Sequence, residues 1–98
     1  MAFEIIFKKR FVNNLIKVLA YLQNEWSDKV ASDFLLKVDS RIEMLKNSPN
    51  IGIASKKVPG VRGMLITKHN MIFYKIEDKR IIVLNLYDTR SNPKKSLI

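Results

Sequence analysis

Few side chains in this sequence can transfer a proton or bind a phosphate. His69 is the only histidine and no cysteine is present, which excludes a two-histidine mechanism, a cysteine nucleophile and a thiolate-bound zinc ion. His69 follows Lys68 in a short polar segment, and Tyr87 and Arg90 come at the end of a later apolar run. Together these side chains offer a proton acceptor, proton donors and cations for a phosphate. They are the candidate catalytic residues, and the alternative for His69 is an exposed turn residue without a role.

Sequence motifs for other kinds of catalytic or ligand-binding site are absent. There is no glycine-rich phosphate loop, no carboxylate cluster for magnesium and no helix-turn-helix signature, so we expect neither a metal nor an organic cofactor. The chain has no apolar run of about 18 residues, and its first residues lack a secretion signal. With no cysteine to form disulfides, these features predict a cytoplasmic protein that does not contact a membrane.

The charge of the chain is strongly positive and unevenly distributed. The formal net charge is +9. Residues 11–49 contain five bases and five acids, whereas residues 50–98 contain ten bases and three acids. A basic half beside a neutral half indicates a face that meets phosphate or an acidic protein. The candidate contacts with a target or partner in this half are Lys56, Lys57, Arg62 and Arg90.

Each of these contacts has a simpler alternative. Lys56 and Lys57 can belong to a solvated loop, Arg62 can hydrogen-bond loop carbonyls, and Arg90 can pair with Asp88. On charge alone, the protein could also be a soluble basic domain with no special partner.

The apolar pattern of the first half predicts one strand and two helices. Residues 2–8 are rich in apolar side chains, as in a short strand. From Phe11 the apolar positions recur at helical spacing. A second helix is expected over residues 28–47, with Ser27 or the next residue as its N-cap. Trp26 lies between the two predicted helices, and we expect it to pack at a corner of the core.

The second half predicts a loop followed by three strands. Residues 51–63 contain three glycines and a proline, so they should be mostly loop. The expected strands are residues 64–67, 71–76 and 81–87, followed by a polar tail over 88–98. The third strand is nearly all apolar, which indicates a central position with both faces covered. The order β-α-α-β-β-β predicts an α+β fold over a single domain, 1–98, with a helical hairpin on one face of a small, mainly antiparallel sheet.

This topology predicts which polar residues meet. In an antiparallel meander, the turn between the first two strands and the end of the third share one edge of the sheet. His69, Lys68, Tyr87 and Arg90 lie in those two segments, so a compact site can hold all four. Arg62 falls at the opposite edge, roughly 15–20 Å away at about 3.3 Å per residue.

Several segments of the sequence form a pattern when they are taken in order. They are Trp26…Ala31-x-x-Phe34, Ile42-x-x-Leu45 running into Pro49-x-x-Gly52, Gly60 to Arg62, Met71 to Ile76 with Ile81 to Leu84, and Leu86 to Pro93 with Arg90 inside it. In this order, and with this size and charge, they resemble the RelE/ParE toxin superfamily over nearly the whole chain. The resemblance implies the toxin of a type II toxin–antitoxin module, a plasmid stabilisation protein that arrests growth unless its antitoxin binds it.

The members of this superfamily divide by target. RelE-like members cut messenger RNA on the ribosome without a metal, whereas ParE-like members are not nucleases and block DNA gyrase. The cationic position that RelE proper carries ahead of its central strand falls here on Met71, and a single histidine leaves the catalytic set incomplete. We therefore favour a ParE-like, non-enzymatic gyrase inhibitor. The alternatives are a ribosome-dependent mRNA endoribonuclease and an inactive toxin-fold module that binds nucleic acid through its charge.

The resemblance also implies a protein partner. We expect a cognate acidic, amphipathic antitoxin segment that folds on binding and docks on the Lys/Arg-rich half of the chain. The complex can be a heterotetramer or larger. The expected target is DNA gyrase, or the ribosome with its messenger RNA.

Overall fold

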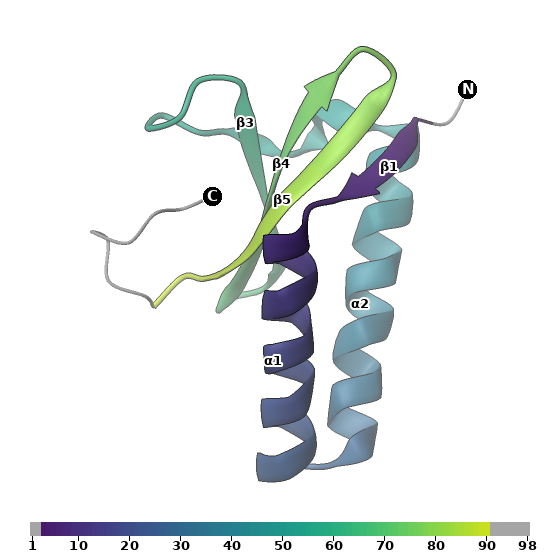
Figure 1. Cartoon of the computed structure of the whole chain (residues 1–98), viewed down its shortest axis with the longest axis vertical. Helices are drawn as coiled ribbons and strands as arrows, with labels where there is room; N and C mark the ends of the chain where they lie inside the picture. Colours follow the sequence, from purple (N-terminus) through teal and green to yellow (C-terminus); the bar gives the residue numbers. More distant parts are fainter. Residues whose placement is uncertain (1–2, 91–98) are drawn as a thin grey trace.

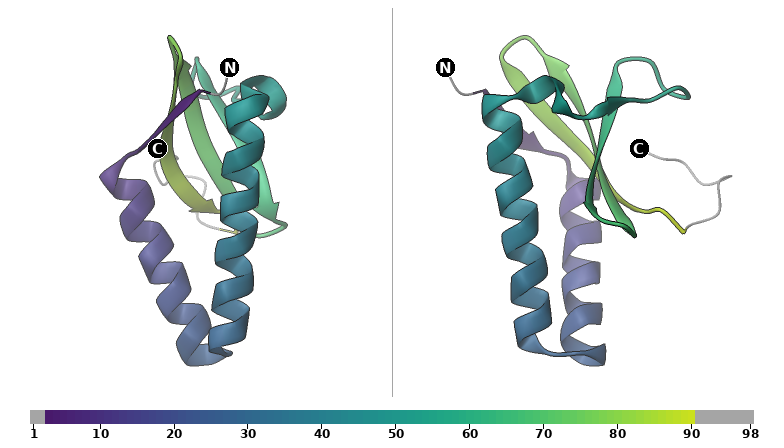
Figure 2. Two further views of the ribbon diagram at one scale, coloured as in Figure 1. Left: turned by 90° about the vertical axis from the view of Figure 1, so that its right-hand side faces the viewer. Right: turned by 180° about the vertical axis from the view of Figure 1, so that it is seen from behind.

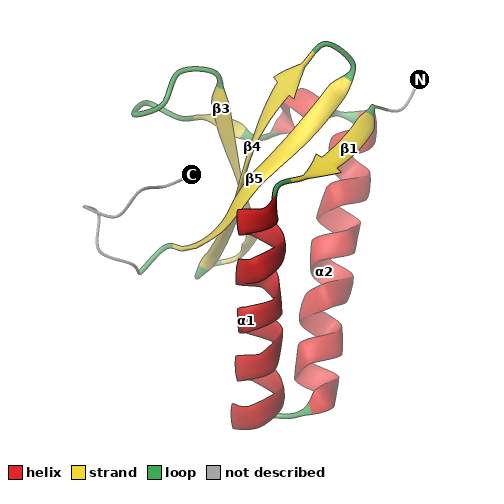
Figure 3. Cartoon of the chain, in the orientation of Figure 1, coloured by secondary structure: helices red, strands yellow, loops and turns green. Residues whose placement is uncertain are grey.

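Two helices form a hairpin that packs against a five-stranded sheet (Figures 1 and 3), which confirms the predicted α+β fold. The computed structural model describes residues 3–90, so the predicted tail lies outside the described residues from position 91 onward. Among the described residues, no helix is long and apolar enough to cross a membrane. The elements are β1 (Glu4–Phe7), α1 (Lys9–Glu25), α2 (Asp28–Asn47), the 3₁₀ turn η1 (Pro49–Ile51), β2 (Ile53–Ala54), β3 (Val61–Thr67), β4 (Asn70–Glu77) and β5 (Arg80–Asp88).

The sheet is mainly antiparallel, with one parallel pair. Its strand order is β1-β5-β4-β3-β2, and β1 runs parallel to β5. β5 lies between two strands and most of its residues are buried, as its apolar sequence predicts. Residues 51–63 are less of a loop than expected, because they contain part of η1, the short β2 and the start of β3. β3 begins at Val61 because this residue already pairs with Lys75 of β4.

The two helices begin in different ways. At the start of α2, the Val30 N–H donates to Ser27 Oγ at 3.1 Å, so Ser27 is the N-cap as predicted. α1 begins at Lys9, two residues before the predicted Phe11. Its N-cap is Lys8, whose side chain makes no capping hydrogen bond. One residue separates β1 from α1, so the helix starts as soon as the pairing with β5 ends.

The hydrophobic core lies between the sheet and the inner faces of both helices. The largest fully buried side chains are those of Tyr74, Leu45, Ile72, Ile81 and Val83. They come from α2, β4 and β5, so the two inner strands of the sheet carry most of the packing. Phe11 of α1 and Phe34 of α2 belong to the same cluster.

Trp26 does not fill a corner of this core, and that prediction is wrong. Its side chain is 70 % exposed. Trp26 is the C-cap of α1, and both helices extend well past the sheet before they reach the turn between them (Figure 2). The hairpin turn therefore lies beyond the elements that could have covered the indole ring.

Tyr74 ties the centre of the sheet to the turn that follows α2. Its side chain is fully buried. The Tyr74 hydroxyl donates to the Pro49 carbonyl at 2.7 Å and accepts from the Gly52 N–H at 2.9 Å. A Cβ atom at Gly52 would collide with this hydroxyl. Burial raises the pKa of Tyr74, so the phenol stays protonated and can donate.

We predict that Tyr74→Phe destabilises the protein by about 1–3 kcal/mol, because it leaves a buried N–H and a carbonyl without their shared partner. Urea unfolding followed by circular dichroism measures the change. Tyr21→Phe is the matched control, since the Tyr21 side chain is 58 % exposed and should change stability by less than about 0.5 kcal/mol. Equal effects of the two substitutions would contradict the role given to Tyr74.

Candidate functional site at the helix–sheet groove

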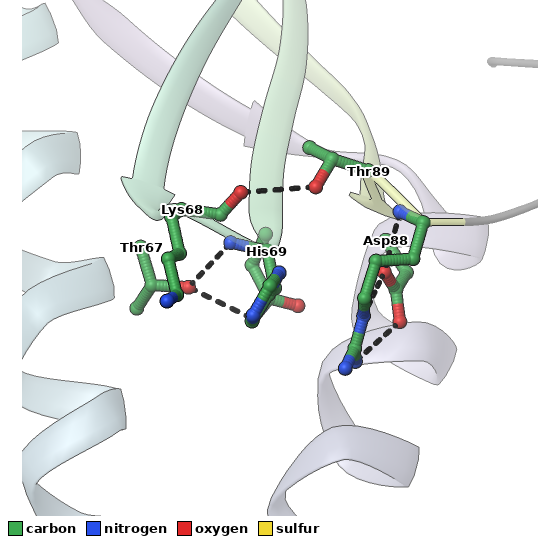
Figure 4. Close-up of polar contacts among 7 residues, drawn as sticks. Thr67, Lys68, His69, Asp88 and Thr89 are labelled. Carbon is green, nitrogen blue, oxygen red and sulfur yellow. Dashed lines mark hydrogen bonds and ion pairs between the residues drawn. The ribbon is translucent and has the colours of Figure 1, made fainter.

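The turn between β3 and β4 and the end of β5 share one edge of the sheet, as the topology predicts. Asn70 pairs with Asp88 in the sheet register. The Thr89 N–H donates to the His69 carbonyl at 2.9 Å, and the Thr89 hydroxyl donates to the Lys68 carbonyl at 3.0 Å (Figure 4). Backbone and side-chain bonds therefore hold Lys68 and His69 beside the C-terminal end of β5.

His69 is held at this edge by its backbone. Its N–H donates to Thr67 Oγ1 at 3.2 Å, and the Asn70 side-chain amide donates to the same oxygen at 3.1 Å (Figure 4). The imidazole itself has no hydrogen-bond partner among residues 3–90. A histidine that acts as a general base is normally oriented by a partner on its second nitrogen. His69 lacks that arrangement in the free protein.

Arg90 is bound to Asp88 and not to His69. Its Nε and one terminal nitrogen donate to the two Asp88 carboxylate oxygens at 3.1 and 3.0 Å, and its N–H donates at 2.8 Å. The side-chain hydrogen bond from Arg90 is the main reason that the pKa of Asp88 is lowered. The same bond raises the pKa of Arg90. The alternative proposed for Arg90, an ion pair with Asp88, is therefore formed.

Tyr87 lies on the other side of the sheet from the Asp88–Arg90 pair. Its ring contacts Phe73 with centroids 5.7 Å apart. Side chains alternate along a strand, and Ile72 and Tyr74 belong to the core. Phe73 and Tyr87 therefore lie on the opposite face, which we call the open face. The candidate catalytic residues share an edge but are divided between the two faces of the sheet.

The open face is apolar where these strands meet. Met71 pairs with Tyr87 in the register. A Cβ atom at Gly63 of β3 would lie 2.8 Å from Met71 Sδ and 3.2 Å from the Phe73 ring. These four residues thus pack against one another across three strands.

The remaining sequence candidates lie elsewhere. Arg62 donates to the carbonyls of Gly52 and Asn50 at 2.8 and 3.3 Å, which is the structural alternative raised for it. Arg62 pairs with Tyr74, four positions from Asn70 or about 13 Å along the strand, so it does not join the edge. Lys56 and Lys57 are exposed in the loop between β2 and β3.

A groove opens between the helical hairpin and the sheet edge, and sequence analysis missed it. Its volume is about 620 Å³. Residues from α1, α2, the β3–β4 turn and the end of β5 line it: Lys17, Val18, Tyr21, Leu22, Val30, Asp33, Phe34, Lys37, Thr67, Asn70, Asp88 and Arg90. The helical spacing of Lys17 with Tyr21 and of Asp33 with Lys37 was a signal that each pair shares one face of a helix. Sequence alone could not show that these two helix faces lie opposite each other across a groove.

The groove has an apolar interior and a positive rim. Asp33 is bound by Lys29 at 3.0 Å, and Asp88 is bound by Arg90. Lys17 and Lys37, one on each helix, have no acidic partner within the described part of the chain. The groove can therefore accept a segment that presents apolar side chains to Val18, Leu22, Val30 and Phe34 and carboxylates to the two lysines.

Comparison with known proteins gives a family and a fold. The family model of the ParE toxin of the type II toxin–antitoxin system, parDE, matches residues 5–93. No curated protein matches the sequence.

Three solved structures of toxins illustrate the similarity of fold. A chain of the chromosomal ParDE system of P. aeruginosa has a TM-score of 0.76 at 15 % identity, over 89 % of this chain and 96 % of that one. The YoeB dimer of Staphylococcus aureus gives 0.64 at 14 %, over 89 % and 97 %. The intact RelBE complex of E. coli gives 0.62 at 14 %, over 92 % and 100 %.

The Asp88–Arg90 pair predicts a pH dependence. Because the folded-state pKa of Asp88 lies below its usual value of 3.8, the pair stabilises the fold at neutral pH and loses this effect as the pH falls through the lowered pKa. Both side chains are largely exposed, so solvent screening keeps this contribution small. NMR titration of the Asp88 carboxyl should give a midpoint below 3.8, and Arg90→Ala should raise it toward that value. An unchanged midpoint in Arg90→Ala would show that the pair does not form in solution.

Proposed function

Because the chain belongs to the ParE toxin family of type II toxin–antitoxin systems, we propose that it arrests growth by inhibiting DNA gyrase and does not cut RNA. Family membership makes the chain a type II toxin. The choice of gyrase is supported by one observation above all, the apolar packing of Met71, Phe73 and Tyr87 on the open face of the sheet.

Cleavage of RNA without a metal places strict demands on a site. A base must take the proton of the 2′-hydroxyl, an acid must protonate the leaving oxygen, and cations must stabilise the charged phosphate between them. His69 has no orienting partner in residues 3–90, and Arg90 is bound to Asp88 on the groove side of the sheet. Tyr87 packs on Phe73 across the sheet from that pair. The arrangement therefore favours a protein that acts by binding, in the cytoplasm where gyrase works.

An antitoxin is the partner expected for a type II toxin, and the groove is our candidate for its docking site. The neighbours in fold include the toxins of a heterotetrameric YoeB–YefM complex and of the RelBE complex. An amphipathic acidic segment would bury its apolar side chains against Phe34 and its neighbours and place carboxylates near Lys17 and Lys37. The charge distribution predicted that the antitoxin docks on the Lys/Arg-rich half of the chain. The groove extends this predicted surface to the two helices.

The gyrase proposal is tested with two purified systems side by side. We predict that the protein inhibits supercoiling by DNA gyrase at stoichiometric concentrations and leaves the message intact in a translating extract examined by primer extension. His69→Ala should inhibit gyrase as the wild type does, because the proposal gives the imidazole no role. Codon-phased cuts in the message that disappear in His69→Ala would instead establish the RelE-like endoribonuclease. If the protein shows neither activity and only binds nucleic acid in a salt-sensitive way, the inactive module would be favoured.

The docking site is tested with charge reversals. The probe is the acidic protein encoded beside the toxin gene, and binding is measured by isothermal titration calorimetry. Lys17→Glu and Lys37→Glu should each weaken binding about tenfold or more, since each places a like charge opposite a carboxylate. Lys79→Glu is the matched control, because Lys79 lies in the turn between β4 and β5. Equal affinity in all three variants would remove the antitoxin from the groove.

A further inference from the structure

A second set of bases lies along the half of the sheet that is away from the groove. It combines the turn that connects β4 to β5, which lies beside the start of β1, with the junction of β1 and α1, which lies beside Val83 about 10 Å further along β5 (Figure 1). We call this set the basic end. Its members are Lys8, Lys9, Lys75, Lys79 and Arg80.

β1 connects the two places, because its start pairs with Arg80 and Lys8 at its end donates its N–H to the Val83 carbonyl at 2.9 Å. Glu4 of β1 pairs with Arg80 of β5 in the parallel register, and its N–H donates to the Lys79 carbonyl at 3.0 Å. Lys75 forms an ion pair with Glu77 at 2.9 Å. Lys75, then Arg80 and Lys8, lower the pKa of this exposed glutamate.

The acids of this region do not neutralise the basic end. Glu77 is shared among three bases. Glu4 lines a separate cavity with Asp39 and Glu43, between β1 and α2. Asp78 occupies the tip of the turn with a φ of 56°. The five bases thus exceed the acids beside them, so the surface carries a net positive charge.

The bases at the start of α1 are placed where folding disfavours them. The first turn of α1 contains no acidic residue, and cations at the N-terminal end of a helix interact unfavourably with the helix dipole. α2 follows the opposite pattern, with Ser27 as its cap and Asp28 in its first turn. A local choice that weakens the helix is expected where the residues serve a function other than folding.

We propose that the basic end binds the phosphate backbone of double-stranded DNA. The choice of DNA rests on the proposed function, because gyrase holds a DNA duplex that the toxin would meet in the same complex. A duplex carries one negative charge about every 1.7 Å of its axis, and clustered lysines and arginines bind it by displacing counterions. β5 spans Arg80 to Asp88, so along the strand Arg80 lies about 26 Å from the groove residue Asp88, and Lys8, which bonds Val83, about 17 Å from it. A segment docked in the groove would leave the basic end exposed.

The test measures DNA binding in the absence of gyrase. A fluorescein-labelled 30-base-pair duplex is titrated with the protein between 50 and 200 mM salt, and anisotropy gives the affinity. We expect a dissociation constant between about 1 and 100 µM near physiological salt. Two double variants, Lys8→Gln with Lys9→Gln and Lys79→Gln with Arg80→Gln, should each weaken binding about tenfold and lower the salt slope by about 2.

The control removes the same charge from elsewhere. Lys29→Gln with Lys46→Gln alters α2, where both lysines already pair with acids, and should change the affinity less than about twofold. Thermal unfolding should show no loss of stability in the Lys8/Lys9 variant, since it removes cations from a helix N-terminus. Equal losses in all three double variants would mean that net charge alone drives binding and would overturn the proposal. Tighter binding to an RNA duplex of the same length would overturn the choice of DNA.

DNA binding by the basic end and inhibition of gyrase can be tested independently. A protein that inhibits gyrase but does not bind the duplex contradicts the basic end as a DNA site and leaves the gyrase assignment intact. A protein that binds the duplex through these bases but does not inhibit gyrase supports the basic end and contradicts the gyrase assignment.

Discussion

The buried hydroxyl of Tyr74 is the interaction on which the arrangement of this protein depends. It bonds to Pro49 and Gly52 and so fixes the turn after α2 against the middle strand of the meander. Arg62 binds the same turn from β3. Once β4 is held in this way, its antiparallel register places the end of β5 beside the β3–β4 turn. The groove exists because this sheet edge then faces the helical hairpin.

The fold separates three surfaces that a single small protein can use independently. The groove is apolar with lysines on its rim, the open face carries the packed Met71, Phe73 and Tyr87, and the basic end lies along the half of β5 away from the groove. This separation explains why a chain with a net charge of +9 need not present one continuous basic face. It also means that an antitoxin segment in the groove and a nucleic acid at the basic end would not compete for the same side chains.

Much of the fold could be predicted from the sequence, because each element has a clear apolar period. The sharing of one edge by His69 and Arg90 also followed from the topology of a meander. The groove could not be predicted, since it requires two helix faces and a sheet edge to meet in space. Trp26 was misplaced because periodicity identifies apolar positions but not how far a helical hairpin extends beyond its sheet. The division of Tyr87 from Asp88, the partner of Arg90, was available in principle, because neighbouring residues in a strand point to opposite faces.

We propose above all that the protein arrests growth by changing DNA topology and not by cutting the messenger RNA of the cell. The most direct measurement expresses the protein in cells without an antitoxin. In the same cells, the supercoiling of a reporter plasmid is measured and the new 5′ ends of messenger RNAs are mapped. The account predicts relaxed or broken plasmid at the onset of arrest, with no new ends in phase with codons. Arrest with a normally supercoiled plasmid and codon-phased 5′ ends would contradict it.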